Sequence, residues 1–192
     1  RSTLAYANEK RDWRIYQAFA EYLIKKARKL YQHDTTFLGE LDGTFYALDA
    51  TTIDLCLSVF QWAHFREYKG AVRLHTLLDL KGQIPAFIHI TDGTVHDVNV
   101  LDELPIEQEA CYIMDRGYVD YRRLYSIDQG GGYFIIRAKR NMRFVRMYSH
   151  VVDTFTGVRC DQTIRFSGYR VGREYPDKLR RVKYYDKQTD QH

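Results

Sequence analysis

Two short apolar runs, each followed by an aspartate, constrain the fold of this 192-residue chain more than any other feature. They are Thr44–Asp49 and Cys111–Asp115, and the two aspartates stand 66 positions apart. A short run of apolar and aromatic residues next to turn residues is typical of a buried strand. If the two strands are neighbours in one sheet, the side chains of Asp49 and Asp115 enter the same crevice.

The remaining periodic segments predict a mixed sheet flanked by helices. Helices are expected over three segments: 12–31, 97–104 and 118–129. Strands are expected over three further apolar runs: 71–80, 84–90 and 133–136. The turn residues Lys81-Gly82-Gln83 indicate that the first two of these runs form a hairpin. This alternation of helix and strand favours an α/β fold, although residues 50–70 are hard to assign.

Charge is distributed unevenly along the chain, whose formal net charge is +4. Residues 1–136 contain fifteen Lys and Arg against nineteen Asp and Glu, whereas residues 137–183 contain thirteen against four. An acidic part joined to a basic part suits a metal site beside a polyanion-binding surface. A solvated basic face without a partner explains the charge equally well.

We divide the chain into three regions by pattern and composition. A helical segment spans residues 1–40, and an α/β core spans residues 41–140. Residues 141–192 are rich in Tyr, Arg and Val with no helical period, which predicts a β-rich region. No run approaches eighteen apolar residues, so we expect no membrane span and a cytoplasmic protein. Cys56, Cys111 and Cys160 form neither a zinc pattern nor a disulfide framework, and we interpret them as buried thiols.

Two aspartates in one crevice predict a bound cation. Close like charges raise the pKa of one carboxyl group unless a cation neutralises the pair. Carboxylate oxygens suit Mg²⁺, and two such ions about 3.5–4 Å apart can support an in-line phosphoryl displacement. From these residues alone, the alternative that each aspartate only caps a turn stays open.

Five longer strings resemble, in order, the DDE transposases of the insertion-sequence-four type. They are Leu48–Ile53 (LDATTI), Lys69–His75 (KGAVRLH), Thr91–Asp97 (TDGTVHD), Asp115–Asp120 (DRGYVD) and Arg137–Asn141 (RAKRN). The resemblance extends from about Ser2 to Lys187 and implies a ribonuclease-H-like mixed sheet flanked by helices. It makes Asp49 and Asp115 the first two catalytic, metal-binding acids, and residues 141–192 the start of an incomplete β-rich insertion.

The same resemblance implies metal-dependent phosphodiester hydrolysis and strand transfer at the ends of an insertion sequence. The expected cofactors are two Mg²⁺ or Mn²⁺ ions, and the expected partner is double-stranded DNA in the bacterial nucleoid, with a homodimer on DNA left open. The family's third acid, a glutamate on a later helix, has no match here, because the surroundings of Glu174 differ from its motif. We therefore expect this chain to be inactive alone. A catalytically dead DNA-binding fragment and a nuclease of the same fold are the alternatives.

Several basic and polar residues are candidates for DNA contact. Arg116 follows the second acid, where contact with a phosphate and neutralisation of a carboxylate are both open. A dense basic stretch is expected to contact DNA phosphates: Lys139, Arg140, Asn141, Arg143 and Arg146. His96 could orient a phosphate or water, but we favour a structural hydrogen bond.

Overall fold

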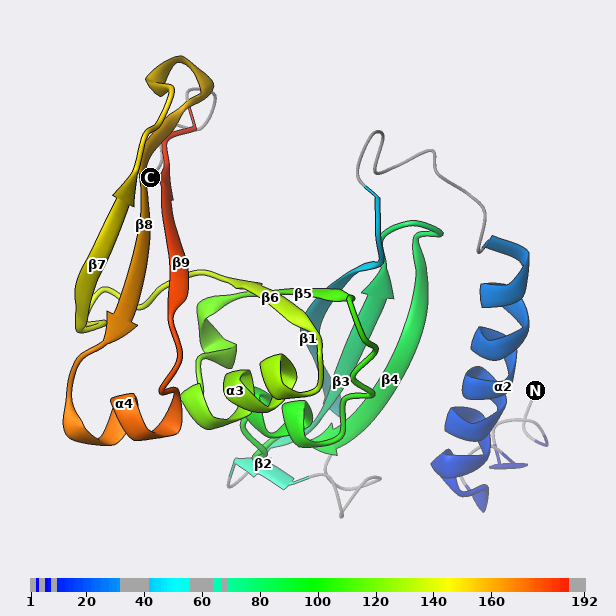
Figure 1. Ribbon diagram of the computed structural model, residues 1–192. Helices are drawn as coiled ribbons and strands as arrows, with labels where there is room; N and C mark the ends of the chain where they lie inside the picture. The colour runs from blue at the N-terminus through cyan, green and yellow to red at the C-terminus, as the bar shows by residue number, and fades with distance from the viewer. Residues whose placement is uncertain are drawn as a thin grey trace. The chain divides into compact units, whose positions relative to one another are not determined.

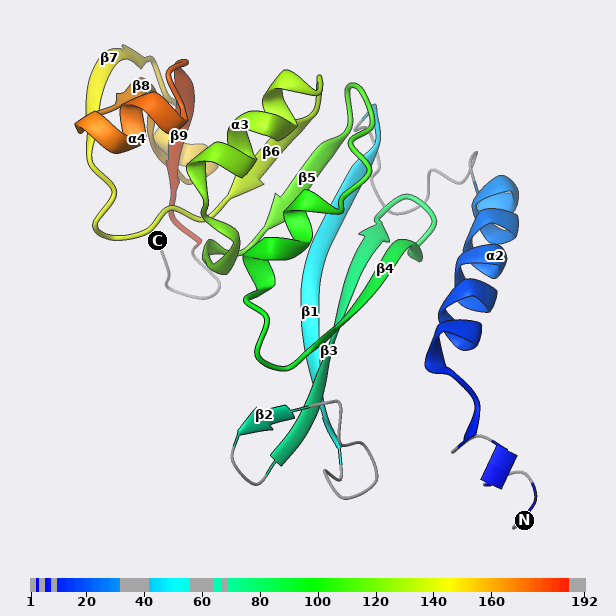
Figure 2. The ribbon, with the colours of Figure 1, turned by 90° about the horizontal axis from the view of Figure 1, so that it is seen from below.

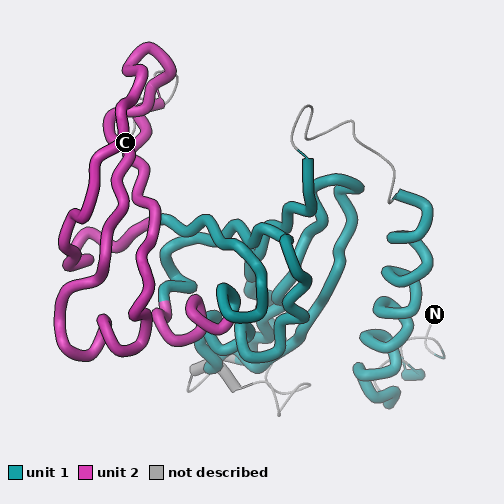
Figure 3. The backbone as a smooth tube through the Cα atoms, viewed as in Figure 1, with its two compact units in different colours: residues 1–119, 127–137 teal, residues 120–126, 138–192 magenta. Residues whose placement is uncertain are grey.

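The computed structural model describes residues 10–31, 42–55, 64–66 and 69–186, together with Thr3, Tyr6 and Ala7. The chain forms two compact units (Figure 3). The first comprises residues 1–119 and 127–137, and the second comprises residues 120–126 and 138–192. The helices in the described part of the chain are all too short or too polar to cross a membrane.

A six-stranded mixed sheet forms the centre of the first unit (Figures 1 and 2). Its strands are β1 (Phe45–Leu55), β2 (His64–Arg66), β3 (Lys69–Asp79), β4 (Ile84–Asp92), β5 (Cys111–Met114) and β6 (Tyr133–Ile136). Their order is β2-β3-β1-β5-β6, and β4 also pairs with β3. Strand β3 runs antiparallel to β1 and β4, whereas β1, β5 and β6 are parallel. This arrangement confirms the predicted mixed-sheet fold class and the predicted hairpin.

The two faces of this sheet differ in burial. Successive strand residues point to opposite faces, and one set of alternate residues is buried: Tyr46, Leu48, His75, Leu77, Tyr112 and Met114. On the opposite face the side chains are more open, and Tyr133 and Ile135 on β6 are 61% and 56% exposed. By this alternation Asp49, which is exposed, belongs to the open face.

Four helical segments accompany the sheet: α2 (Trp13–Tyr31), η1 (Asp97–Asp102), η2 (Arg116–Tyr118) and α3 (Tyr121–Gln129). Helix α2 packs against β4, and Asp12 caps its start by accepting a hydrogen bond from the Arg14 N–H at 2.9 Å. The prediction of one helix over 118–129 was wrong at its start. Val119 has an extended backbone, with ψ of 98°, and this separates the η2 turn from α3.

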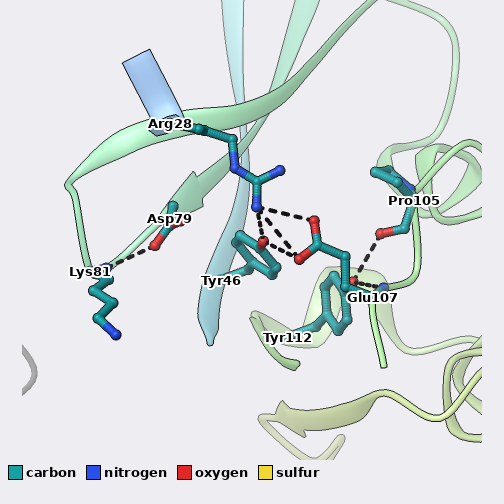
Figure 4. Close-up of polar contacts among 7 residues, drawn as sticks. All are labelled: Arg28, Tyr46, Asp79, Lys81, Pro105, Glu107 and Tyr112. Atoms are coloured by element: carbon teal, nitrogen blue, oxygen red, sulfur yellow. Dashed lines mark hydrogen bonds and ion pairs between the residues drawn. The ribbon is translucent and has the colours of Figure 1, made fainter. Parts of the chain in front are cut away.

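A hydrogen-bonded network joins α2 to the covered face of the sheet (Figure 4). The Arg28 guanidinium donates to the Tyr46 hydroxyl at 2.6 Å and to the Glu107 carboxylate at 3.1 Å. The Tyr46 hydroxyl in turn donates to Glu107 at 2.7 Å. Burial and the Glu107 carboxylate raise the pKa of Tyr46 far above its usual range, so its hydroxyl stays protonated.

We expect Glu107→Ala to lower the free energy of unfolding by about 1–3 kcal/mol, because Arg28 and Tyr46 both lose an acceptor. Urea denaturation at pH 7 measures this change. Glu103→Ala is the matched control, since Glu103 is exposed and its carboxylate has no partner in the described residues. Its effect should stay within about 0.5 kcal/mol. Equal losses in the two variants would contradict a role for the network.

The second unit contains a three-stranded antiparallel sheet in the order β7-β8-β9. Its elements are β7 (Phe144–His150), η3 (Thr154–Thr156), β8 (Val158–Phe166), α4 (Tyr169–Glu174) and β9 (Leu179–Tyr184). The expectation of a β-rich region is confirmed, and one short helix, α4, forms within it. The short helix α4 contains the ion pair Arg170–Glu174, at 2.8 Å with the i, i+4 spacing of a helix.

Candidate functional site

Asp49 and Asp115 follow directly after paired residues on neighbouring parallel strands. Leu48 on β1 is in register with Met114 on β5, so the two acids occupy the next position on each chain. Neighbouring strands lie about 4.8 Å apart, and the backbone of Asp115 is still extended, with φ of −78° and ψ of 173°. The structure therefore brings the two predicted residues to adjacent backbone positions, with both side chains on the open face of the sheet.

The two strands end differently around this pair. Strand β5 ends at Met114, as expected, and the chain turns into η2. Strand β1 was expected to end at Asp49 but continues to Leu55, because β3 pairs with it over its whole length beyond Phe45. Asp49 is thus in mid-strand, opposite Thr76. In the described part of the chain, β1 has a strand neighbour only on its β3 side after Leu48.

Both carboxylates are exposed and held by a backbone N–H through one oxygen. Asp49 Oδ1 accepts from the Ala50 N–H at 2.8 Å, and Asp115 Oδ1 accepts from the Gly117 N–H at 2.6 Å. Neither carboxylate makes an ion pair with a described residue. Arg116 is exposed and likewise pairs with no carboxylate within the ranges described. Two adjacent carboxylates that form no ion pair with the described residues repel each other, which favours a bound cation.

The donor set fits a hard divalent cation. Carboxylate oxygens are the ligands that Mg²⁺ and Mn²⁺ prefer. Mg²⁺ keeps several waters and commonly binds through one or two carboxylates together with substrate phosphates, so this pair fits the protein's part of such a site. Among the described residues, no group of three or more His, Cys, Asp or Glu side chains is placed to hold a metal. The site therefore differs from a closed zinc site, which needs four nitrogen or sulfur ligands.

Tyr118 lies close to the acid pair and was missed as a site residue from the sequence. Its side chain is 2% exposed, and its hydroxyl has no hydrogen-bond partner in the described structure. Burial raises the pKa of Tyr118, and the charges of Asp97, Asp49 and Asp115 raise it further. Asp97 itself pairs with Arg73 at 2.6 Å. The sequence signal for Tyr118 was its place in the Asp115–Asp120 string, three residues after Asp115.

We expect Tyr118→Phe to raise the free energy of unfolding by about 1 kcal/mol, because it removes a buried hydroxyl that has no partner among the described residues. Tyr112→Phe is a matched comparison with the opposite expected sign. The Tyr112 hydroxyl accepts from the Glu107 N–H at 2.8 Å and donates to the Pro105 carbonyl at 2.9 Å. Urea denaturation of both variants tests the contrast. A similar destabilisation in both would show that a buried water satisfies Tyr118.

Of the predicted DNA-contact residues, Arg116 lies in the first unit. The other five lie in the second unit and are exposed: Lys139, Arg140, Asn141, Arg143 and Arg146. Arg140, Arg143 and Arg146 form no side-chain hydrogen bond or ion pair with any described residue. By contrast, Arg170 pairs with Glu174 and Arg180 pairs with Asp161, at 2.8 and 2.6 Å. The stretch from 140 to 146 therefore presents positive charge that no carboxylate of the described chain neutralises.

The structure departs from the sequence expectations for His96 and for one of the cysteines. The His96 side chain is exposed and makes no hydrogen bond with the described residues, so the expected structural bond is absent there. Cys111 is a buried free thiol, as expected, whereas Cys160 is half-buried. Cys56 lies outside the described residues.

Comparison with known proteins gives two matches. The family model described as "Transposase DDE domain" matches residues 40–191, which include both acids of the pair. The protein named "Putative transposase y4zB" from Sinorhizobium fredii (strain NBRC 101917 / NGR234) is 30% identical over 140 residues. That alignment covers 70% of this chain but 38% of the relative, so it spans little more than a third of the relative's own length. No solved structure matches the chain.

Proposed function

Because this chain belongs to the DDE transposase domain family, we propose that Asp49 and Asp115 are the first two metal-binding acids of a DNA transposase of the insertion-sequence-four type. The observation that carries the proposal is their position. Two exposed carboxylates without a basic partner in the described chain follow the paired residues Leu48 and Met114 of parallel strands. Both acids also lie inside the segment that matches the family.

The proposed reaction is hydrolysis of a phosphodiester at the element end, followed by strand transfer. Water attacks the phosphorus and the bond to the 3′-oxygen breaks, which leaves a 3′-hydroxyl and a 5′-phosphate. That hydroxyl then attacks a second phosphodiester, on the opposite strand or in target DNA, and displaces its 3′-oxygen. Mg²⁺ or Mn²⁺ bound at the pair would activate the attacking oxygen and stabilise charge on the leaving oxygen.

The chain's own contribution is to hold the two carboxylates in a fixed orientation. Backbone N–H groups donate hydrogen bonds to Oδ1 of Asp49 and to Oδ1 of Asp115. In the described structure, Oδ2 of each residue accepts no hydrogen bond, so it is available to a cation. In the described part of the chain, no strand pairs with β1 on the β5 side after Leu48.

Crystals soaked in Mn²⁺ test this assignment directly. We expect anomalous density within about 2.0–2.4 Å of a carboxylate oxygen of both Asp49 and Asp115. Density at another site alone, or no density at saturating Mn²⁺, would contradict the proposed metal centre. Asp115→Asn crystals under the same soak provide the control, since they should lose the density.

We further propose that the chain is inactive alone, because the third acid that the resemblance implies, a glutamate on a later helix, has no match in the sequence. The support is that no third acidic side chain accompanies the pair within the described residues. With Mn²⁺ and a duplex that carries the element end, we expect no cleavage above the level of the Asp49→Asn variant. Efficient cleavage by these 192 residues, lost in that variant, would contradict this part of the proposal.

DNA binding without catalysis is the second candidate function, favoured by the unneutralised charge in the second unit. Lys139, Arg140, Asn141, Arg143 and Arg146 are the proposed contacts there, and Arg116 is a further one in the first unit. Lys and Arg side chains contribute the salt-dependent part of DNA affinity by displacing counterions from phosphates. Two results together would favour this function over the enzyme. The wild-type chain would bind no Mn²⁺, and its DNA affinity would be unchanged by Asp49→Ala and Asp115→Ala.

A further inference from the structure

In the turn that follows Asp115, one residue, Gly117, lies in close contact with the Asp115 carboxylate. Gly117 donates its backbone N–H to Asp115 Oδ1 at 2.6 Å, which caps the η2 turn. A Cβ atom placed on Gly117 would lie 2.8 Å from the same oxygen. It would lie 3.7 Å from Cγ and 3.9 Å from Oδ2, so its three nearest neighbours all belong to the Asp115 carboxyl group.

The backbone itself does not require glycine at this position. Gly131, Gly157 and Gly168 have φ values of 79°, 91° and 110°, in the region that disfavours L side chains. Gly117 is not among the residues with positive φ and lies in a right-handed helical turn. An alanine could therefore adopt its backbone conformation, and the obstacle to it is the carboxylate of Asp115.

We propose that Gly117 is a positioning residue for Asp115, an inference that rests on the proposed metal-binding role of that aspartate. The Gly117 N–H fixes Oδ1, and the missing side chain leaves the room that this orientation needs. With Oδ1 fixed, Oδ2 is directed to a cation shared with Asp49. A methyl group at 117 displaces an exposed, rotatable carboxylate, so the metal site is lost while the fold is kept.

The variant Gly117→Ala shows whether the metal site can be lost while the fold stays stable. Mn²⁺ titration of the full chain, followed by electron paramagnetic resonance, should show affinity weakened by about ten- to a hundredfold, the range for residues that orient metal ligands. The melting temperature without metal should change by no more than about 2 °C, because the displaced group is at the surface.

Gly172→Ala is the matched control. Gly172 lies in helix α4, its φ is not positive, and a Cβ there would meet only the Phe166 carbonyl oxygen, at an ordinary 3.6 Å. We expect its Mn²⁺ affinity to stay within about twofold of the wild type. An equal loss in Gly117→Ala and Gly172→Ala would overturn the inference, because no specific contact with Asp115 would then be involved.

A double-mutant cycle tests whether Gly117 acts through Asp115. In an Asp115→Ala background, Gly117→Ala should weaken residual Mn²⁺ binding no further, whereas independent effects would add. Wild-type affinity in Gly117→Ala, or a full loss in both backgrounds, would overturn the positioning role. If instead the wild type binds no Mn²⁺, or binds it equally well without Asp49 and Asp115, the proposed function itself is wrong and the inference falls with it.

Discussion

Asp49→Asn and Asp115→Asn are each expected to weaken Mn²⁺ binding by at least about a hundredfold, the largest effect of any single substitution in this chain. Each removes one of the two negative charges that would hold the cation. Asparagine keeps the oxygen that accepts from Ala50 or Gly117 at 2.8 and 2.6 Å, so the local fold should survive. Isothermal titration measures the Mn²⁺ affinity, and urea denaturation measures the free energy of unfolding.

The control for these two variants is Asp54, which lies on the same strand as Asp49. Asp54 is exposed on β1 and has no side-chain partner among the described residues, but it lies beyond the paired end of β5. Asp54→Asn should leave Mn²⁺ affinity within about twofold. A loss as large as that of Asp49→Asn would mean that the metal responds to net charge, and that no specific centre exists.

The triple variant Arg140→Ala, Arg143→Ala and Arg146→Ala is expected to weaken duplex DNA binding by about one to three orders of magnitude at low salt. Each phosphate contact contributes about 0.9 to the slope of log affinity against log salt concentration, so the slope should become shallower by up to about 3. Fluorescence anisotropy across a salt series gives both the affinity and the slope. The loss should be similar for different DNA sequences, because phosphate contacts carry no base information.

Arg170→Ala combined with Arg180→Ala provides the comparison. Both guanidinium groups are in the same unit but already pair with carboxylates, Glu174 and Asp161. Their removal should change the salt slope by less than about 1. If this double variant loses as much affinity as the triple variant, DNA binding depends on the overall charge of the unit and not on the 140–146 stretch.

The position of each acid after a buried strand segment could be predicted, because both apolar runs are short and lie next to turn residues. That the two strands are neighbours was only a condition at that stage, and the pairing of β1 with β5 fulfils it. Strand β5 matches its predicted segment closely, and the predicted hairpin forms as β3 and β4. The full length of β1 could not be predicted, because residues 50–55 become a strand only through pairing with β3. Polar residues such as Thr51 and Thr52 give that segment no apolar alternation of its own.

Contacts between distant residues account for most of what the sequence could not predict. Arg28 and Glu107 stand 79 positions apart, and Tyr46 and Glu107 stand 61 apart, yet they form one network. The close approach of position 117 to the Asp115 carboxylate is a distance in space, visible only once Asp115 caps its turn. The Tyr118 hydroxyl has no hydrogen-bond partner among the described residues, and its relation to the acids emerges from its burial and from the nearby charges of Asp49 and Asp115.

The shortness of the β1–β5 ladder makes alignment between these strands critical. Only four residue pairs join them, and a shift by one residue would turn every β5 side chain to the other face. Such a mispaired strand would still be hydrogen-bonded, but Asp115 would point into the interior. Such a shift would also turn the ring of Tyr112, now fully buried, to the open face of the sheet. The burial of this ring thus favours the alignment that places the two acids side by side.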